Sequence, residues 1–96
     1  MNNILFQHKV VKDNRITLAA KKDEETNNLN VSISICSNSE QFRKEKGRTI
    51  ASGRLNKGVK TILLPIGEDN PSYVLNTFSK ELTTQTIKSI KHSFGL

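Results

Sequence analysis

The chain has 96 residues, a net charge of +6 at neutral pH and a sequence pI of about 9.7. This length predicts a single domain over residues 1–96 with a small core. A membrane-spanning helix needs roughly 20 apolar residues, and the longest apolar run here covers only residues 62–66, so such a helix is excluded. Hydrophobic residues are 34% of the chain, below the roughly 45–50% of ordinary domains in a count that includes glycine. This shortage predicts either a thin two-layer fold or a protomer that completes its core in a homodimer.

The first third of the chain has the pattern of a β meander. Two strand-like runs, Ile4 to Lys12 and Arg15 to Lys21, are separated by Asp13-Asn14, a pair that tolerates positive φ and suits a two-residue hairpin. After a polar turn at Asp23 to Asn28, the run Leu29 to Cys36 alternates apolar and polar residues. This alternation predicts a strand with one apolar face and one wet polar face. The apolar face carries Leu29, Val31, Ile33 and Ile35, and the wet face carries Asn30, Ser32, Ser34 and Cys36.

A helix is expected next, from about Glu40 to Leu55. Ser37 forms a capping box with the glutamate three residues later, and Ser39 is a rival N-cap. The helix would contain two glycines, each of which costs roughly 1 kcal/mol relative to alanine in a helix interior. A loop through Gly47 followed by a shorter helix from Arg48 is therefore the alternative.

The second half of the chain predicts one strand and further helix. Gly58 is expected to cap the first helix, and Val59 to Ile66 forms a nearly continuous apolar strand suited to a buried or central position. Asn70 is a candidate N-cap and Pro71 a first helical residue. The apolar stripe changes direction near Thr83, which favours two helices over one curved helix. The elements together predict an α+β fold: an antiparallel sheet of about four strands with one central short helix and one or two C-terminal helices packed on one face.

The segment from Phe42 to Lys60 holds the strongest functional signal. It contains seven cations and one anion in nineteen residues. Glycine lets a backbone come close to a ligand, and the planar fork of arginine grips phosphate or carboxylate. The segment therefore predicts an anion- or phosphate-binding site made of Arg43, Lys44, Gly47, Arg48, Gly53, Arg54 and Lys57, with steering charge from Lys46, Lys57 and Lys60.

A purely structural interpretation of the same segment stands beside this one. In it, the glycines pack a helix tightly against a sheet while the arginines extend into water. On one uninterrupted helix, Arg48 and Arg54 point about 120° apart, so they could not both grip one ligand. Arg43, Gly47, Ile50 and Arg54 would share a face.

No catalytic or metal site is expected. Cys36, His8 and His92 show no metal-ligand spacing, no nucleophile is followed by a motif that supplies its base, and no cofactor motif occurs. No strand carries interleaved aromatic residues, which argues against base-stacking nucleic-acid folds. The lone cysteine and the absence of a signal-like start predict a reducing cytosol.

The stretch from Cys36 to Leu55 resembles a pattern in small accessory proteins of bacteriophages: a strand ending in Cys-Ser, an aromatic residue, a basic run, Gly-Arg and a short helix with Ala and Gly. The composition, rich in Asn, Lys and Ile, is similar to that of proteins from AT-rich phage genomes. The resemblance implies a host-directed or anti-defence role in the cytoplasm of a bacterial host. Proteins of this kind block the nucleic-acid groove of a nuclease or sequester a nucleotide signal.

The predicted function is binding without catalysis, and three classes of partner stay open. The first is a nucleotide or nucleotide-like signal held in an enclosed pocket, expected between protomers. The second is nucleic acid contacted through its phosphates, with an affinity that falls steeply with salt. The third is an acidic or nucleic-acid-mimicking surface of a host protein.

Overall fold

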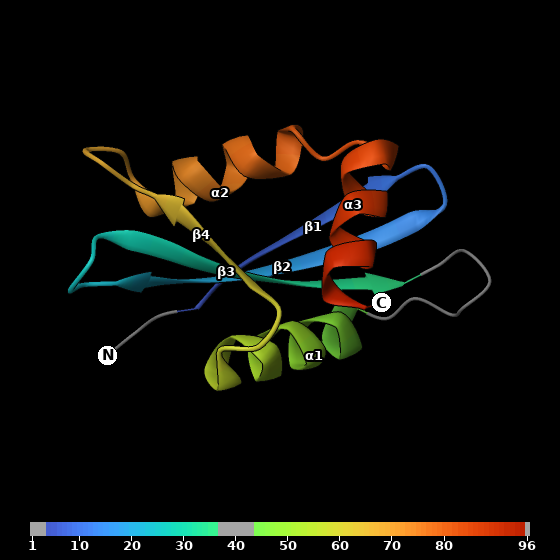
Figure 1. Cartoon of the computed structure of the whole chain (residues 1–96), viewed down its shortest axis with the longest axis horizontal. Coiled ribbons are helices and arrows are strands. Elements are labelled where there is room, and N and C mark those ends of the chain that lie inside the picture. Colours follow the sequence, from blue (N-terminus) through green and yellow to red (C-terminus); the bar gives the residue numbers. More distant parts are fainter. Residues whose placement is uncertain (1–3, 37–43, 96) are drawn as a thin grey trace.

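Seven elements follow in the order βββαβαα in the computed structural model, which describes residues 4–36 and 44–95 (Figure 1). The strands β1 (Leu5–Val11), β2 (Asn14–Asp23), β3 (Asn28–Cys36) and β4 (Thr61–Pro65) form one antiparallel sheet in the order β1-β2-β3-β4. The helices are α1 (Lys44–Lys57), α2 (Pro71–Lys80) and α3 (Thr84–Phe94). The predicted α+β class and the four-stranded antiparallel sheet are therefore confirmed.

The first hairpin turns one residue earlier than predicted. Its turn residues are Lys12 and Asp13, and Lys12 has a φ of 51°. Asn14, which the sequence placed in the turn, is instead in β2 opposite Val11. Its side-chain oxygen accepts a hydrogen bond from Lys91 Nζ of α3 at 3.2 Å, so a tertiary contact uses this side chain in place of the local turn.

The main core lies between the sheet and the two C-terminal helices. Ile16 and Leu18 of β2, and Leu29 of β3, are 0% exposed. They pack in one cluster with Leu75 of α2 and Ile87 of α3. Each such side chain contributes roughly 1.5–3 kcal/mol relative to leaving it in water. The alternation predicted for β3 is confirmed on this apolar face.

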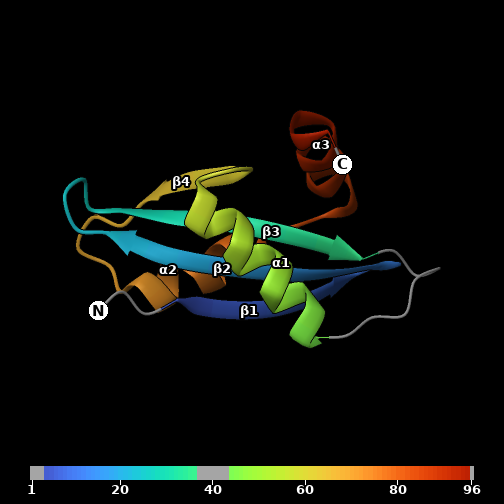
Figure 2. The same cartoon turned by 90° about the horizontal axis from the view of Figure 1, so that it is seen from below.

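The opposite face of the sheet is covered as well. The prediction that β3 has one wet face was therefore wrong, and so was the prediction that all helices pack on one face of the sheet. Helix α1 crosses this face, while α2 lies on the other side of the sheet (Figures 1 and 2). Thr17, Ala19 and Ser32, which point toward α1, are all 0% exposed. The chain therefore forms three layers and not the thin two-layer fold that its low apolar content predicted. The sheet is covered on both faces within one chain, so a homodimer is not needed to complete the core.

Small and polar residues make this second layer possible. Gly47 lies so close to the sheet that a Cβ there would stand 2.3 Å from Thr17 Oγ1. The Ser32 hydroxyl donates to the carbonyl of Ala51, which is itself fully buried. In the described part of the chain, every buried side-chain nitrogen or oxygen has a hydrogen-bond partner, so this packing leaves no unsatisfied polar group. Helix α1 needs no large apolar stripe here, which is why periodicity could not predict its docking.

Helix α1 also decides between the two predictions for the middle of the chain. It runs without interruption from Lys44 to Lys57, so Gly47 is helical and not part of a loop. Its expected N-caps, Ser37 and Ser39, lie outside the described residues.

Strand β4 is an edge strand, so the predicted buried or central position of the segment from Val59 to Ile66 was wrong. Lys60 has a φ of 55°, a left-handed conformation that interrupts extended backbone, and the strand begins only at Thr61. The side chain of Leu63 is 61% exposed. The apolar run alone could not reveal that, among the described strands, only β3 pairs with β4.

The C-terminal segment forms two helices, as the sequence favoured. Asn70 Oδ1 accepts from the N–H of Ser72 at 2.8 Å, and Pro71 begins α2. At the break, Thr83 and Thr86 form a reciprocal capping box: each hydroxyl accepts from the backbone N–H of the other residue. The second helix therefore starts at a specific cap and is not a bent continuation of the first.

Candidate anion-binding site

A surface hollow of about 410 Å³ lies between the C-terminal half of α1 and the turn into β4. We call it the α1 hollow. Figure 2 shows this end of α1 beside β4. The hollow is lined by Thr49, Ile50, Gly53, Arg54, Lys57, Val59 and Lys60. Its volume lies within the roughly 300–1,000 Å³ typical of sites for small ligands.

The helix cap brings the two ends of the hollow together. Gly58, with a φ of 67°, donates from its N–H to the Leu55 carbonyl at 3.1 Å, and Val59 donates to the Arg54 carbonyl at 2.9 Å. This pair of bonds is the Schellman motif, so the predicted glycine cap at position 58 is confirmed. The left-handed Lys60 then turns the chain back beside the helix. Lys60 thereby lines the same hollow as Lys57.

Arg54 is held in place by the sheet. Its Nη1 donates to the backbone carbonyl of Ile33 at 2.5 Å, and the side chain is half-buried. The pairing of β3 with β4 stops at Ser32, which lies opposite Thr61, the first residue of β4. Ile33 is the next residue of β3 and has no partner in β4. A guanidinium has five N–H donors. One donor anchors the group, and Arg54 also lines the hollow.

The α1 hollow carries a strong positive charge. Three cations line it and no carboxylate does. Among the described residues, the ion pair present joins Lys22 Nζ and Glu24 Oε2 at 3.5 Å, and neither residue lines the hollow. The C-terminal end of a helix contributes about −0.5 of an elementary charge, which disfavours an anion. Three full positive charges outweigh that contribution, so the net field of the hollow attracts anions.

The two glycines of α1, Gly47 and Gly53, differ in the space that surrounds them. At Gly47, the sheet leaves no room for a Cβ, whereas a Cβ at Gly53 would meet no atom within 4 Å. The packing of the chain therefore accounts for Gly47 and not for Gly53. Because Gly53 lines the hollow, its missing side chain leaves that wall open to a ligand.

The structure brings together only part of the predicted site. Gly53, Arg54 and Lys57 line the hollow, joined by Lys60, which the sequence suggested only as steering charge. Gly47 faces the sheet. Arg48 is exposed and, by helical spacing, lies about 180° around the axis from Lys57. Arg43 and the side chain of Lys44 lie outside the described residues.

Three lining residues were not predicted. Thr49 and Ile50 lie four and three residues before Gly53, so helical spacing from the glycine could have identified them. Val59 follows the predicted glycine cap, but the left-handed turn at Lys60 that places it at the hollow has no sequence signature. With the half-buried Ile50, the 46% exposed Val59 gives the cationic hollow an apolar side.

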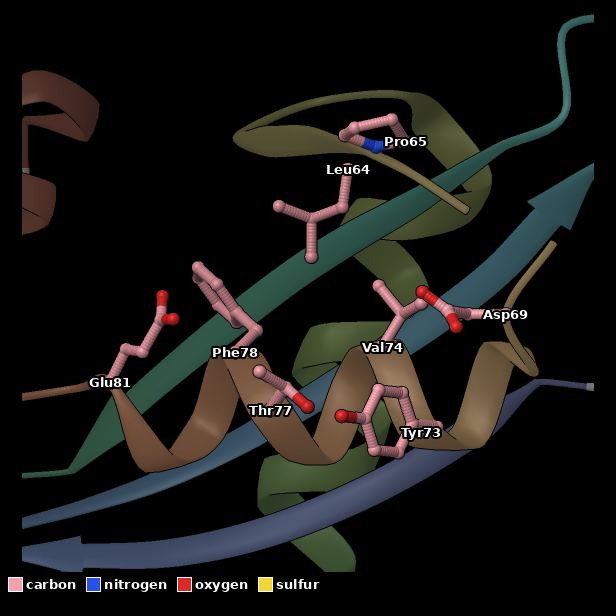
Figure 3. A pocket seen from close by; sticks show the side chains of 8 residues that line it. All are labelled: Leu64, Pro65, Asp69, Tyr73, Val74, Thr77, Phe78 and Glu81. Atoms are coloured by element: carbon pink, nitrogen blue, oxygen red, sulfur yellow. The ribbon is translucent and has the colours of Figure 1, made fainter. Parts of the chain in front are cut away.

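A second crevice, of about 210 Å³, lies between β4 and α2 (Figure 3). Leu64, Val74 and Phe78 form its apolar part, and Asp69 and Glu81 stand at opposite ends. Carboxylates repel anions, so this crevice does not extend the predicted site.

Comparison with protein-family models, with curated proteins and with solved structures finds no match to this chain. In residues 4–36 and 44–95, no three or more His, Cys, Asp or Glu side chains are grouped so that they could hold a metal ion. No helix within those ranges is long and apolar enough to cross a membrane.

Proposed function

We propose that this chain is a non-enzymatic binding protein whose α1 hollow takes a phosphate-bearing small ligand of the nucleotide class. One observation carries the proposal: three cations from two separate segments converge on a hollow that no carboxylate lines. A nucleotide combines phosphates with a flat base. The hollow offers charge from Arg54, Lys57 and Lys60 for the first part and the side chains of Ile50 and Val59 for the second.

This geometry favours a nucleotide over the other two partners. A nucleic-acid duplex is held by phosphate contacts spread along its backbone, but here the cations gather at one end of one helix. A flat acidic protein surface would not need a hollow. The salt dependence of binding separates the alternatives, because neutralising many phosphates gives a steep slope and a small ligand gives a shallow one.

The anti-defence role implied by the resemblance to phage accessory proteins stays a prediction. Sequestration of a nucleotide signal is the form of that role that agrees with the α1 hollow, because it needs a ligand pocket and no catalytic residue. An enclosed pocket between protomers is not required, since the hollow is lined by a single chain.

The test is isothermal titration calorimetry with ATP and with inorganic pyrophosphate in about 0.1 M salt. The double variant K57Q/K60N removes two of the three cations, and asparagine tolerates the left-handed backbone of position 60. Hydrogen bonds to charged groups contribute about 1.5–3 kcal/mol each, so the affinity of the double variant should fall about 100-fold or more.

The matched control is R48Q, which removes a cation from the same helix on the side away from the hollow. It should change the affinity by less than about threefold, because its exposed charge lies on the opposite side of the helix and 0.1 M salt, with a Debye length of roughly 10 Å, screens such a charge. Binding that survives K57Q/K60N, or that is lost equally in R48Q, contradicts the assignment. Tight binding of a 12-nucleotide single-stranded DNA without any binding of ATP would identify nucleic acid as the partner instead.

A further inference from the structure

The outer edge of β1 has an unusual combination of features for an exposed strand edge. Strand β1 is the first strand of the sheet, and its seven residues pair only with β2 among the described strands. Two apolar side chains of β1, Phe6 and Val10, are 41% and 64% exposed. They lie four residues apart and so project from the same face. Natural proteins usually protect such edges with charge, proline or very short strands.

The backbone of β1 at these two positions also faces outward. Val11 and Asn14 flank the two-residue turn, and residues in that position form a hydrogen-bonded pair. Hydrogen-bonded and non-hydrogen-bonded pairs alternate along an antiparallel ladder. Phe6 and Val10 are therefore at non-hydrogen-bonded positions, and their N–H and C=O groups point away from β2.

We propose that the chain forms a two-fold symmetric homodimer in which β1 pairs antiparallel with β1 of a second copy, joining the two sheets into one. When all seven residues pair, Phe6 lies opposite Val10 of the partner subunit, and Val10 lies opposite Phe6 of the partner subunit. The outward-facing backbone groups of these residues then form the hydrogen-bonded pairs. The same register buries both exposed apolar side chains in two equivalent cross-strand contacts.

The other sheet edge fits this role less well. Strand β4 has five residues, and it ends in Pro65, which has no N–H to donate. Its exposed apolar residue, Leu63 at 61%, has no second residue of β4 at reciprocal spacing. Among the described edge strands, β1 alone has two exposed apolar side chains at positions that face each other across a two-fold axis.

The proposed interface has properties that separate it from ligand binding at the α1 hollow. It is small compared with the roughly 1,600 Å² of a standard interface, so the dimer should dissociate on dilution. Each copy carries a net charge of +6, and the copies repel one another. Added salt screens this repulsion and strengthens the dimer, whereas it weakens binding of a phosphate ligand. The dimer does not rest on the proposed function.

Sedimentation velocity over a wide range of concentrations tests the proposal. The wild type should change from monomer to dimer as concentration rises. V10K should raise the dimer dissociation constant at least about tenfold, because it removes both cross-strand pairs and places charge on the edge. L63K, an equally exposed apolar position on the opposite edge, should change it less than about twofold. A wild type that stays monomeric at millimolar concentration overturns the proposal, and so does a dimer broken by L63K and not by V10K.

Hydrogen exchange of the wild type provides a test that no folding defect can disturb. At high concentration, the amides of Phe6 and Val10 should exchange at least about tenfold more slowly than at low concentration. The amides of Gln7 and Lys9, which bond to β2, should exchange at the same rate in both samples. A dimer that forms without slowing the Phe6 and Val10 amides excludes the β1 edge.

Discussion

Replacing Gly47 by alanine is expected to destabilise the protein by about 1–3 kcal/mol, although alanine is the better helix former. The added Cβ would stand 2.3 Å from Thr17 Oγ1 and 3.1 Å from Thr17 Cβ. Thr17 is fully buried, and its hydroxyl shares a hydrogen bond with His8 Nδ1, so the side chain has little room to move. Thermal unfolding should show this as a loss of about 4–8 °C in melting temperature for each kcal/mol.

The same substitution at Gly53 should have the opposite sign. A Cβ there meets no atom within 4 Å, so the variant gains helix propensity without a clash and should be up to about 1 kcal/mol more stable. In a T17A background, the cost of G47A should shrink by about 1 kcal/mol or more, because the closest contact is gone. Equal effects of G47A and G53A would show that α1 does not approach the sheet as described.

The second large effect is expected at Ile87, the residue that anchors α3. Ile87 is 1% exposed and packs in the main core. Truncating a buried isoleucine removes its transfer free energy and leaves a cavity, so I87A should cost about 2–5 kcal/mol. The loss is measured by urea unfolding, and an unchanged m value would show that the native and unfolded states keep their compactness.

I90A provides the control for α3. Ile90 lies one turn further along the helix and is only partly buried, so the same chemical change should cost about half as much. A cost for I90A that equals or exceeds that of I87A would mean that α3 docks through a different face. Hydrogen exchange of the α3 amides in I87A reports whether the helix detaches locally before the sheet unfolds.

The main core and the helix ends could be predicted from the sequence because their signals are local. The alternation of residues 29–35 predicts which side of β3 faces the main core, although both sides of the strand are covered. Asn70 marks the start of α2 through a side-chain hydrogen bond made within two residues, and Pro71 follows it as the first helical residue. Local chemistry of this kind does not depend on the rest of the fold.

The close packing of Gly47 against the sheet agrees with the structural interpretation of residues 42–60. The face of the sheet that α1 covers could not be predicted, because the contacts depend on small residues that are far apart in sequence. The contacts are made by small or polar residues that form no apolar pattern in the sequence: Thr17, Ser32, Gly47 and Ala51. Serine and threonine normally indicate an exposed face. Only the three-dimensional arrangement shows that the Ser32 hydroxyl finds a partner in the carbonyl of Ala51. The edge position of β4 is set by strand pairing, which the apolar run from Val59 to Ile66 does not encode.

The candidate site was predicted in composition and only partly in arrangement. The run of cations covers the end of α1 that lines the hollow, but it also includes Arg48 on the other side of the helix. Helical spacing already separated Arg48 from Arg54. The turn that returns Lys60 to the helix has no sequence signature, because lysine rarely adopts a positive φ. The sequence therefore predicts the positive charge of this region, and only the structure shows the hollow that the charged residues line.

The most direct test of the α1 hollow is an NMR titration of the ¹⁵N-labelled wild type with ATP, with inorganic pyrophosphate as the probe for the phosphate part alone. We expect saturable shifts of the Gly53, Lys57 and Lys60 amides with both ligands, additional shifts at Ile50 and Val59 with ATP, and none at Arg48. Shifts spread evenly over the basic surface, or confined to residues outside the hollow, would contradict the account.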